Sequence, residues 1–353
     1  ALTQNSTGSE NTSMGWGALG ANTTASYGTA IGSKALADNT TGANNTAVGE
    51  RGLYVNTTGA NNVAIGAYAL DASNANNNVA IGYDALSANT SGTRGVAVGY
   101  AALDANTTAA DNTGIGNHAL GANTTGASNT AIGSYALDAN TTASHNIAVG
   151  REALSANTTG ADNIAIGSYS LDANTTTSNN VAVGRSSLGS NTAANNTAVG
   201  YNTLFANSTG AKNVAVGAYA LDANTTASNN AAVGYNALSA NTTGTENTGL
   251  GYLALAANTT ASYNTALGST ALDANTTGAS NTSVGQSSLS TNTTGGFNTA
   301  VGRLSMYANT TGTENVAVGY AALDANTTAS YNVAIGSAAL SANTTGGSNI
   351  AIG

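Results

Sequence analysis

The chain has 353 residues, with 7 Lys and Arg against 16 Asp and Glu, and its net charge is −9. Only 7% of its residues are charged, whereas about a quarter of an ordinary soluble domain is charged. The few basic residues and the negative charge argue against a nucleic-acid binder, which needs a basic face. The absence of Cys excludes a disulfide scaffold, thiolate metal sites and cysteine nucleophiles. No apolar run approaches the roughly 18 residues of a membrane span.

One repeat accounts for the chain from Asn11 onwards. Its five-residue signature, Asn-[Thr/Val]-Ala-[Val/Ile]-Gly, stands at residues 45–49 and returns at 62–66 and 78–82. The signature or a close variant of it occurs 21 times, and of the 20 spacings 18 are 17 residues long and two are 16. We number the repeat from position 1, the Asn of the signature, to position 17. Asn45 is therefore at position 1, Leu53 at position 9 and Asn56 at position 12.

Positions 1 to 5 predict a short strand in each repeat, the first at residues 11–15 and the last at 349–353. Position 4 is always Val, Ile, Leu or Met, and position 9 is Leu in every copy except Met306. Because successive strand residues face opposite sides and Val and Ile favour pleated, half-buried surfaces, we expect positions 4 and 9 to form the core. Representative core residues are Val48, Ile65, Ile81, Val98 and Val149 at position 4 and Leu53, Leu70, Leu137 and Leu154 at position 9.

Gly occupies position 5 in all 21 copies, where we expect a bend that forbids a side chain. Representative turn glycines are Gly49, Gly66, Gly133 and Gly150. The Asn-Thr-Thr-Gly run at positions 12 to 15 is a second turn signature. No window of 11 residues keeps the apolar spacing of an amphipathic helix, so the sequence predicts no helices.

A single repeat cannot bury two large side chains, but stacked repeats can, because each coil covers its neighbour. The fold class that we predict is therefore all-β: a parallel β-solenoid, or β-roll, with one 17-residue repeat per coil and about 21 coils. Residues 1–353 are expected to form one continuous array, part of a longer fibre. The Asn residues at positions 1 and 12 should stack as amide ladders, each bonding to its copies above and below. Representative ladder residues are Asn45, Asn62, Asn129 and Asn146 at position 1 and Asn106, Asn123 and Asn140 at position 12.

The two 16-residue repeats each lose one residue after the Leu, around Ser73–Asn77 and Thr192–Asn195. A slip of one residue inside a strand would exchange its two faces. We therefore expect the strands to stay in register and the deletions to be absorbed in the turns.

Position 3 is Ala, Ser or Gly in every copy, and it lies on the strand face opposite position 4. A surface packed closely against another chain would explain this smallness, and so would a tight solvent-facing strand. We favour the first, because two aliphatic side chains per coil make a thin core and both ends cut the array inside a repeat. The expected partner is the chain itself, as a lateral homo-oligomer such as a trimer or as an end-to-end filament. Representative interface residues are Ala47, Ala64, Ala97, Ala131 and Ala165.

The signature at Asn315–Gly319 and Asn332–Gly336 resembles the head repeat of YadA-like trimeric autotransporter adhesins, although the repeat of that family is shorter. The longer unit, N-T-A-x-G-x-x-A-L-x-x-N-T-T-G, resembles repeat arrays of bacterial and phage tail-fibre-like proteins. The resemblance covers essentially the whole chain. It implies a left-handed β-roll fibre, often trimeric, on the surface of a cell or a virion.

Other patterns suggest chemistry that also has a simpler structural explanation. Asp-Ala-Asn-Thr-Thr recurs at position 10, but one carboxylate per site favours a hydrogen-bonded turn over a Ca²⁺ site. Asn-Thr-Thr is an N-glycosylation sequon, yet its period already has a structural reason. The Thr pairs lie beside a Gly turn, which disfavours a flat ice-binding face. Tyr at positions 6 and 7, and the variable sites of His118 and His145, indicate exposed surface, open to glycans or neighbouring fibres.

No catalytic, metal or cofactor constellation is found, so we expect a protein that is not an enzyme and needs no cofactor. The sequence predicts a structural extracellular fibre or adhesin-like stalk that associates with itself on a cell or virion surface. The alternatives are a phage tail-fibre shaft and a glycan- or ice-binding solenoid. Surface glycans or a host receptor would be its further partners, and nucleic acid would not.

Overall fold

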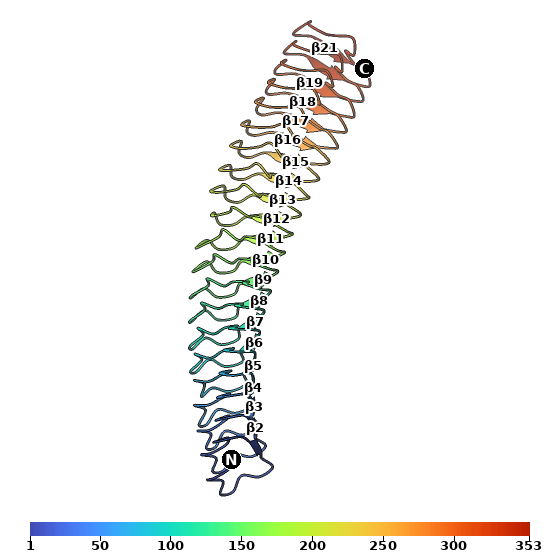
Figure 1. Ribbon diagram of the computed structural model, residues 1–353. Coiled ribbons are helices and arrows are strands. Elements are labelled where there is room, and N and C mark those ends of the chain that lie inside the picture. The colour runs from blue at the N-terminus through green and yellow to red at the C-terminus, as the bar shows by residue number, and fades with distance from the viewer. The chain divides into compact units, whose positions relative to one another are not determined.

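The computed structural model describes residues 1–353 as a parallel β-solenoid with 21 three-residue strands and no helix (Figure 1). The predicted fold class is therefore confirmed. The chain divides into two compact units, Ala1–Asn179 and Asn180–Gly353, each of which is described by itself. The strands of the first unit are β1 (Thr12–Met14), β2 (Thr29–Ile31), β3 (Thr46–Val48), β4 (Val63–Ile65), β5 (Val79–Ile81), β6 (Val96–Val98), β7 (Thr113–Ile115), β8 (Thr130–Ile132), β9 (Ile147–Val149) and β10 (Ile164–Ile166). Those of the second are β11 (Val181–Val183), β12 (Thr197–Val199), β13 (Val214–Val216), β14 (Ala231–Val233), β15 (Thr248–Leu250), β16 (Thr265–Leu267), β17 (Thr282–Val284), β18 (Thr299–Val301), β19 (Val316–Val318), β20 (Val333–Ile335) and β21 (Ile350–Ile352).

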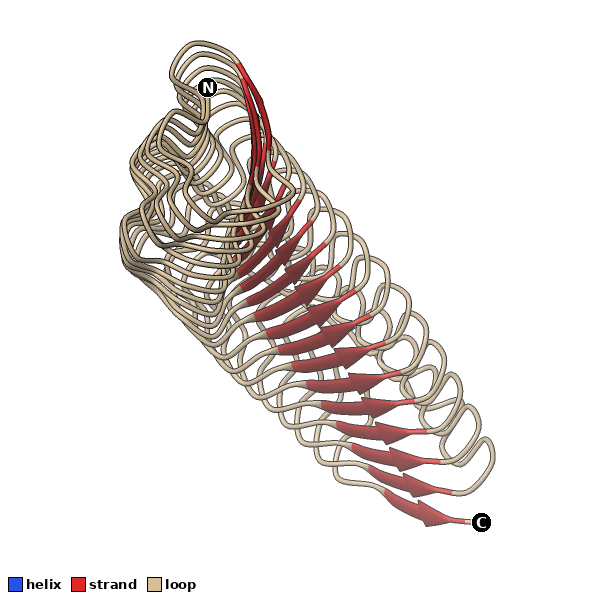
Figure 2. Cartoon of the chain, turned by 90° about the horizontal axis from the view of Figure 1, so that it is seen from below, coloured by secondary structure: helices blue, strands red, loops and turns tan.

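Within each unit every strand pairs in parallel with the strand of the next coil, so that the strands follow chain order. Equal positions of the repeat face each other: Thr46 pairs with Val63, and Val48 pairs with Ile65. Figure 2 shows the strands as a column along one side of the coils, with turns and loops forming the rest of each coil. Each repeat is therefore one coil, as the 17-residue period predicts.

Backbone hydrogen bonds join the coils around the whole circumference. The N–H of Leu53 donates to the carbonyl of Ala69 at 3.0 Å, and the N–H of Thr40 donates to that of Thr57 at 2.9 Å. Three of the turn positions adopt left-handed backbone, as at Arg51, Leu53 and Asn61 with φ of 56°, 51° and 59°. This conformation costs an L-residue about 1–2 kcal/mol, and the bonds between coils offset the cost.

The apolar interior of each coil is built from positions 3, 8 and 9. The prediction for position 9 is therefore confirmed, and that for position 4 is wrong. Leu53, Leu70, Leu137 and Leu154 are fully buried, together with Ala at positions 3 and 8. In contrast, Ile65 is 39% exposed while its neighbour Ala64 is 0% exposed. The position-4 residues Val48, Ile65, Ile81, Val98 and Val149 are all half-buried or exposed. The strand thus faces inwards with position 3.

The strand orientation follows from the space available inside a narrow coil. At Gly114, which replaces Ala at position 3, an added Cβ would lie 3.2 Å from Cγ of Leu103 in the preceding coil. At Gly52, at position 8, it would lie 3.5 Å from Cβ of Ala47. A methyl group fills this space, and a larger side chain would overpack it. The predicted interface residues Ala47, Ala64, Ala97, Ala131 and Ala165 are therefore core residues, each 0% exposed, and cannot contact a partner chain.

The position-5 glycine is required by the neighbouring coil. Gly150 has a φ of 135°, and an added Cβ would lie 2.6 Å from the carbonyl carbon of Gly167. Real Cβ atoms do not approach backbone so closely, and an L-residue strongly disfavours this φ. The predicted turn role of Gly49, Gly66, Gly133 and Gly150 is confirmed, because all four have φ between 130° and 140°.

The two Asn columns are buried but bond differently. At position 12 the ladder runs from amide to amide: Asn140 Nδ2 donates to Asn123 Oδ1 at 2.8 Å, and Asn123 Nδ2 donates to Asn106 Oδ1 at 3.0 Å. At position 1 the backbone N–H of Asn146 donates to Asn129 Oδ1 at 2.9 Å instead. Asn45 Nδ2 closes its own coil by donating to the carbonyl of Gly59. Asn62 donates both its backbone N–H and its Nδ2 to Asn45 Oδ1. Amide-to-amide stacking is thus confirmed for position 12 and only partly found at position 1.

The shortened coils keep their strands in register, as predicted. Val63 pairs with Val79 across the first deletion, and Val181 pairs with Thr197 across the second. In the first shortened coil, Asn74 Oδ1 accepts from the backbone N–H groups of Thr57 and Thr58 at 3.1 and 2.9 Å. A side-chain oxygen thereby replaces a carbonyl that the shorter turn does not supply.

In the second shortened coil, Asn191 Nδ2 donates to the carbonyl of Ala193, two residues ahead. In a full-length coil the same bond reaches three residues ahead, as from Asn140 to Ala143. The turn after Asn191 is therefore tighter by one residue, and this tightening absorbs the deletion.

Candidate functional site

The side chains at positions 2 and 4 of the strands form one outward surface, which we call the strand face. Position 4 is Val, Ile, Leu or Met, and position 2 is Thr in ten of the 21 strands and Val, Ile or Ala in the others. Ile132 and Ile166 are 39% and 40% exposed. Because the strands pair in register, each unit carries two parallel columns of mainly β-branched side chains. Sequence reasoning placed position 4 of this surface in the core.

A second surface lies just after the strand, at positions 6 and 7, where aromatic rings from successive coils meet. In the first unit the row consists of Tyr68, Tyr83, Tyr100, His118 and Tyr135, with centroids 5.4–5.8 Å apart. In the second it consists of Tyr201, Tyr219, Tyr235 and Tyr252, 5.4–6.1 Å apart. These spacings are close to the roughly 4.8 Å between paired strands. Side chains that look scattered along the sequence therefore form two continuous rows, and His118 is part of one.

Carboxylates at position 10 border these aromatic rows. The desolvation of partial burial raises the pKa of Asp104, Asp138, Asp172 and Asp222 above the ordinary value. The charge of His118 opposes this effect on the pKa of Asp104 and Asp138. Unlike these carboxyls, Asp111 has a lowered pKa, because the exposed Arg94 donates hydrogen bonds to it.

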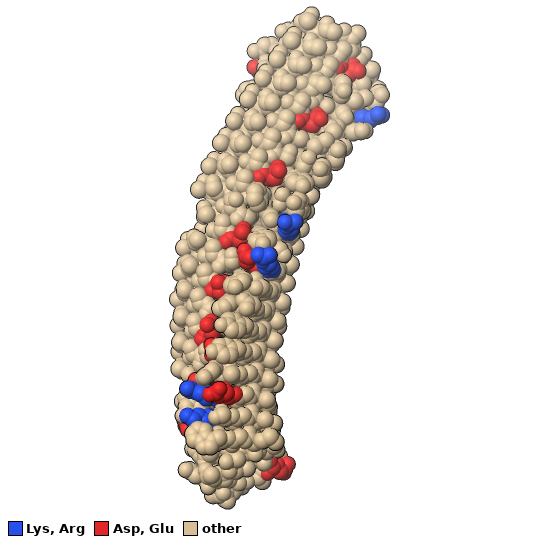
Figure 3. Space-filling view, viewed as in Figure 1, with Lys and Arg blue, Asp and Glu red and all other residues tan.

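Charged side chains are sparse on the surface seen in Figure 3. The structure has three ion pairs: Arg51 with Asp71, Arg94 with Asp111, and Arg151 with Glu152. No group of three His, Asp or Glu side chains is close enough to hold a metal ion. No helix is long and apolar enough to cross a membrane.

The sequon asparagines at position 12 are the interior ladder. Asn123 is 0% exposed, and its Nδ2 donates to Asn106 Oδ1 at 3.0 Å and to the carbonyl of Gly126 at 2.9 Å. Both of its N–H bonds are thus in use, so the folded coil offers no amide nitrogen to a glycosylating enzyme. The following Thr124 donates its hydroxyl to the carbonyl of Thr141 at 3.0 Å, while Thr125 is exposed. The Thr column at position 13 therefore joins neighbouring coils, and the Thr column at position 14 faces solvent.

The coil geometry and its surfaces define a β-solenoid repeat protein. A scan against protein-family models and a search of curated proteins find no match to this chain.

Proposed function

We propose that the chain is a segment of a structural, fibre-like stalk that associates side by side with further copies through the strand face. The repeated coil supports a structural role, because each coil adds one more identical layer. The observation that carries the proposal is the pair of exposed β-branched columns at positions 2 and 4. A contiguous apolar surface of this kind marks an interaction site in soluble proteins.

The size of the strand face supports a stable contact. Full burial of a Val or Ile side chain contributes about 1.5–3 kcal/mol. Ile132 and Ile166 retain 39% and 40% of their exposure, so covering the remainder would contribute about 0.5–1 kcal/mol per side chain. The ten strands of the first unit would then supply about 5–10 kcal/mol from position 4 alone. This is comparable to the roughly 4–15 kcal/mol that association costs, and position 2 adds to it.

We further propose that this stalk functions outside the cell or on a virion surface, as an adhesin-like stalk or a tail-fibre shaft. The support for this location is the resemblance of the repeat to YadA-like heads and tail-fibre-like arrays.

The test is a pair of double substitutions on neighbouring positions of the same strands. Ile132→Arg with Ile166→Arg should leave far-ultraviolet circular dichroism unchanged but yield monomers in sedimentation velocity. Ala131→Arg with Ala165→Arg should disrupt the fold itself, because both alanines are 0% exposed. A matched control with the same added charge places Arg at the exposed Thr125 and Thr159, and it should assemble normally.

Wild-type protein that stays a folded monomer at micromolar concentration would refute side-by-side association. Equal dissociation by the control pair would show that added charge, rather than the strand face, is responsible.

A second candidate function is ice binding, because Thr occupies position 2 of the strand face in runs of consecutive strands, β1–β3, β7–β8 and β15–β18. These Thr residues lie on strands, whereas the Thr pairs at positions 13 and 14 lie in turns. A thermal-hysteresis assay tests it: wild-type protein should show hysteresis, and Thr130→Arg should reduce it. Absence of hysteresis in the wild type would eliminate this candidate.

A further inference from the structure

Tyrosine at position 7 is always followed by aspartate at position 10. The four pairs are Tyr68 with Asp71, Tyr135 with Asp138, Tyr169 with Asp172, and Tyr219 with Asp222. All four tyrosines have left-handed backbone, with φ between 58° and 61°. The tyrosine of each pair therefore has the same backbone conformation, so the surroundings of the four pairs can be compared directly.

At the first pair an arginine of the preceding coil occupies the site. Arg51 donates from Nε and Nη2 to the two carboxylate oxygens of Asp71, at 3.3 and 2.9 Å. Its guanidinium lies 4.6 Å from the ring centroid of Tyr54 and 5.5 Å from that of Tyr68. Two aromatic rings and one carboxylate thus bind a guanidinium, a combination suited to its planar cation.

The other two pairs of the first unit also have a nitrogen-bearing side chain from the preceding coil beside the Tyr. His118 stacks on Tyr135 at 5.5 Å with an interplanar angle of 7°. The guanidinium of Arg151 lies 5.4 Å from the ring centroid of Tyr169. In each case a neighbouring coil covers the tyrosine with a nitrogen-bearing side chain.

The fourth pair has aromatic and acidic side chains at the same positions, but the preceding coil covers Tyr219 with the ring of Tyr201, at 5.4 Å, in place of a cation. Phe205, Tyr219 and Asp222 correspond to Tyr54, Tyr68 and Asp71, while Asn202 stands at the position of Arg51. The backbone there is equivalent, with φ of 50° at Asn202 and 56° at Arg51.

Asp222 lacks a basic partner at this fourth pair, because it belongs to none of the three ion pairs of the structure. Desolvation raises the pKa of Asp222, opposed only by backbone N–H groups of Asp222 and Ala223. This carboxylate has lost hydration without gaining a cation.

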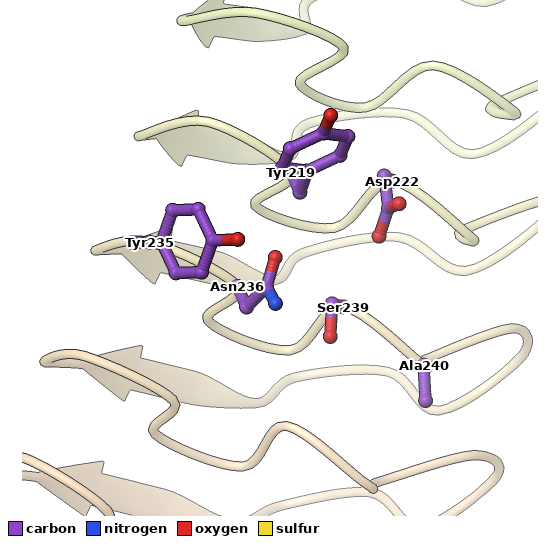
Figure 4. A pocket seen from close by; sticks show the side chains of 6 residues that line it. All are labelled: Tyr219, Asp222, Tyr235, Asn236, Ser239 and Ala240. Atoms are coloured by element: carbon purple, nitrogen blue, oxygen red, sulfur yellow. The ribbon is translucent and has the colours of Figure 1, made fainter.

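An open groove of about 470 Å³ adjoins this pair. It is lined by Tyr219 and Asp222 from one coil and by Tyr235, Asn236 and Ser239 from the next. Figure 4 shows the Asp222 carboxylate directed towards the next coil, with Asn236 and Ser239 on that coil. The groove supplies room and hydrogen-bonding groups for more than the guanidinium itself.

We propose that Tyr219 and Asp222 bind the guanidinium of an arginine side chain that belongs to another polypeptide and enters the groove between their coil and the next, beside Tyr235. The site is distinct from the strand face, since it lies at positions 7 and 10. A second copy of this chain is a poor donor, because only seven Lys and Arg are present and five of them already contact a carboxylate or a ring. The net charge of −9 favours a partner with surplus positive charge.

The experiment titrates the full chain, with ¹³C-labelled tyrosine rings, with the blocked peptide acetyl-Gly-Ser-Arg-Ser-Gly-amide and with its Lys counterpart. The ring resonance that disappears in Tyr219→Phe identifies Tyr219. It should shift saturably with the Arg peptide, and the Lys peptide should bind at least about threefold more weakly, because ammonium lacks the planar fork. Free arginine should bind no more tightly than the Arg peptide, and tighter binding of the free amino acid would overturn the assignment to a polypeptide.

Three variants decide between a built site and diffuse attraction. Asp222→Asn should weaken binding of the Arg peptide by about threefold or more. Asp273→Asn removes the same charge from position 10 of a coil with Thr270 at position 7, and it should not weaken binding. Asn236→Arg, at a residue that lines the groove, should fill the site from within, shift the Tyr219 resonance without peptide and abolish binding. Equal effects of Asp222→Asn and Asp273→Asn, or unchanged binding in Asn236→Arg, would overturn the proposal.

Discussion

Removal of one amide from the position-12 ladder should destabilise the surrounding coils strongly. Asn140 Nδ2 donates to Asn123 Oδ1 at 2.8 Å and to the carbonyl of Ala143 at 3.1 Å, and Asn140 Oδ1 accepts from Asn157 Nδ2 at 3.0 Å. In Asn140→Ala the carbonyl of Ala143 keeps its bond from Asn129. Asn123 Oδ1 and one N–H of Asn157 lose their partners in a buried site. At about 1–3 kcal/mol for each orphaned group, we expect a loss of about 3–5 kcal/mol.

The chain itself contains a milder form of this change. Ser73 replaces the ladder Asn in the first shortened coil, where its hydroxyl accepts from Asn89 Nδ2 at 3.2 Å but leaves Asn56 Oδ1 without a partner. Asn140→Ser should therefore cost less than Asn140→Ala. Thr142→Ala, at an exposed site two residues away, serves as the matched control and should cost almost nothing.

The measurement is native-state hydrogen exchange, because a solenoid can open locally around one weakened coil. Peptides that cover residues 123–157 should lose protection in the order Ala variant, Ser variant, control. If Asn140→Ala exchanged like Thr142→Ala, the ladder would not stabilise the coil and the reasoning from orphaned amides would be refuted.

Three further predictions follow from the coil. Desolvation raises the pKa of Asp172 above 3.8, so the folded chain binds this proton more tightly than the unfolded chain. The free energy of unfolding should accordingly fall as the pH rises from about 3.8 towards neutrality. Asp172→Asn should raise the denaturation midpoint at pH 7 and make the free energy of unfolding less dependent on pH. An unchanged pH dependence in this variant would contradict the raised pKa of Asp172. Gly150→Ala should lower the free energy of unfolding, measured by chemical denaturation, by at least about 3 kcal/mol, because of the strained φ and the close backbone of Gly167. A loss below about 1 kcal/mol would show that the coils can separate to accept the methyl group. Expression with an oligosaccharyltransferase should leave Asn123 and the other buried sequon asparagines of the folded array unmodified in peptide mass analysis. An added glycan at Asn123 would show that the coils open before modification.

The orientation of the strand could have been recognised from the sequence, although our reasoning did not recognise it. Position 3 accepts only Ala, Ser and Gly, while position 4 varies in size from Val98 to Met14 and position 2 is often Thr. A narrow interior tolerates no change of volume, so the position with constant small size is the inner one. We gave more weight to the hydrophobicity of Val and Ile, and the interface was therefore assigned to the wrong face.

The sequence by itself determined the coil length, the parallel register, the buried Leu, the glycine bend and the absorption of the two deletions. Each of these follows from a period that repeats 21 times, because stacking places equal positions above one another. Tertiary structure alone decided which neighbours meet across coils. Arg51 and Asp71 are 20 residues apart, and they pair only because the coil brings position 7 beside position 10 of the next turn. The tyrosine rows and the site at Tyr219 depend on the same juxtaposition, which no local pattern specifies.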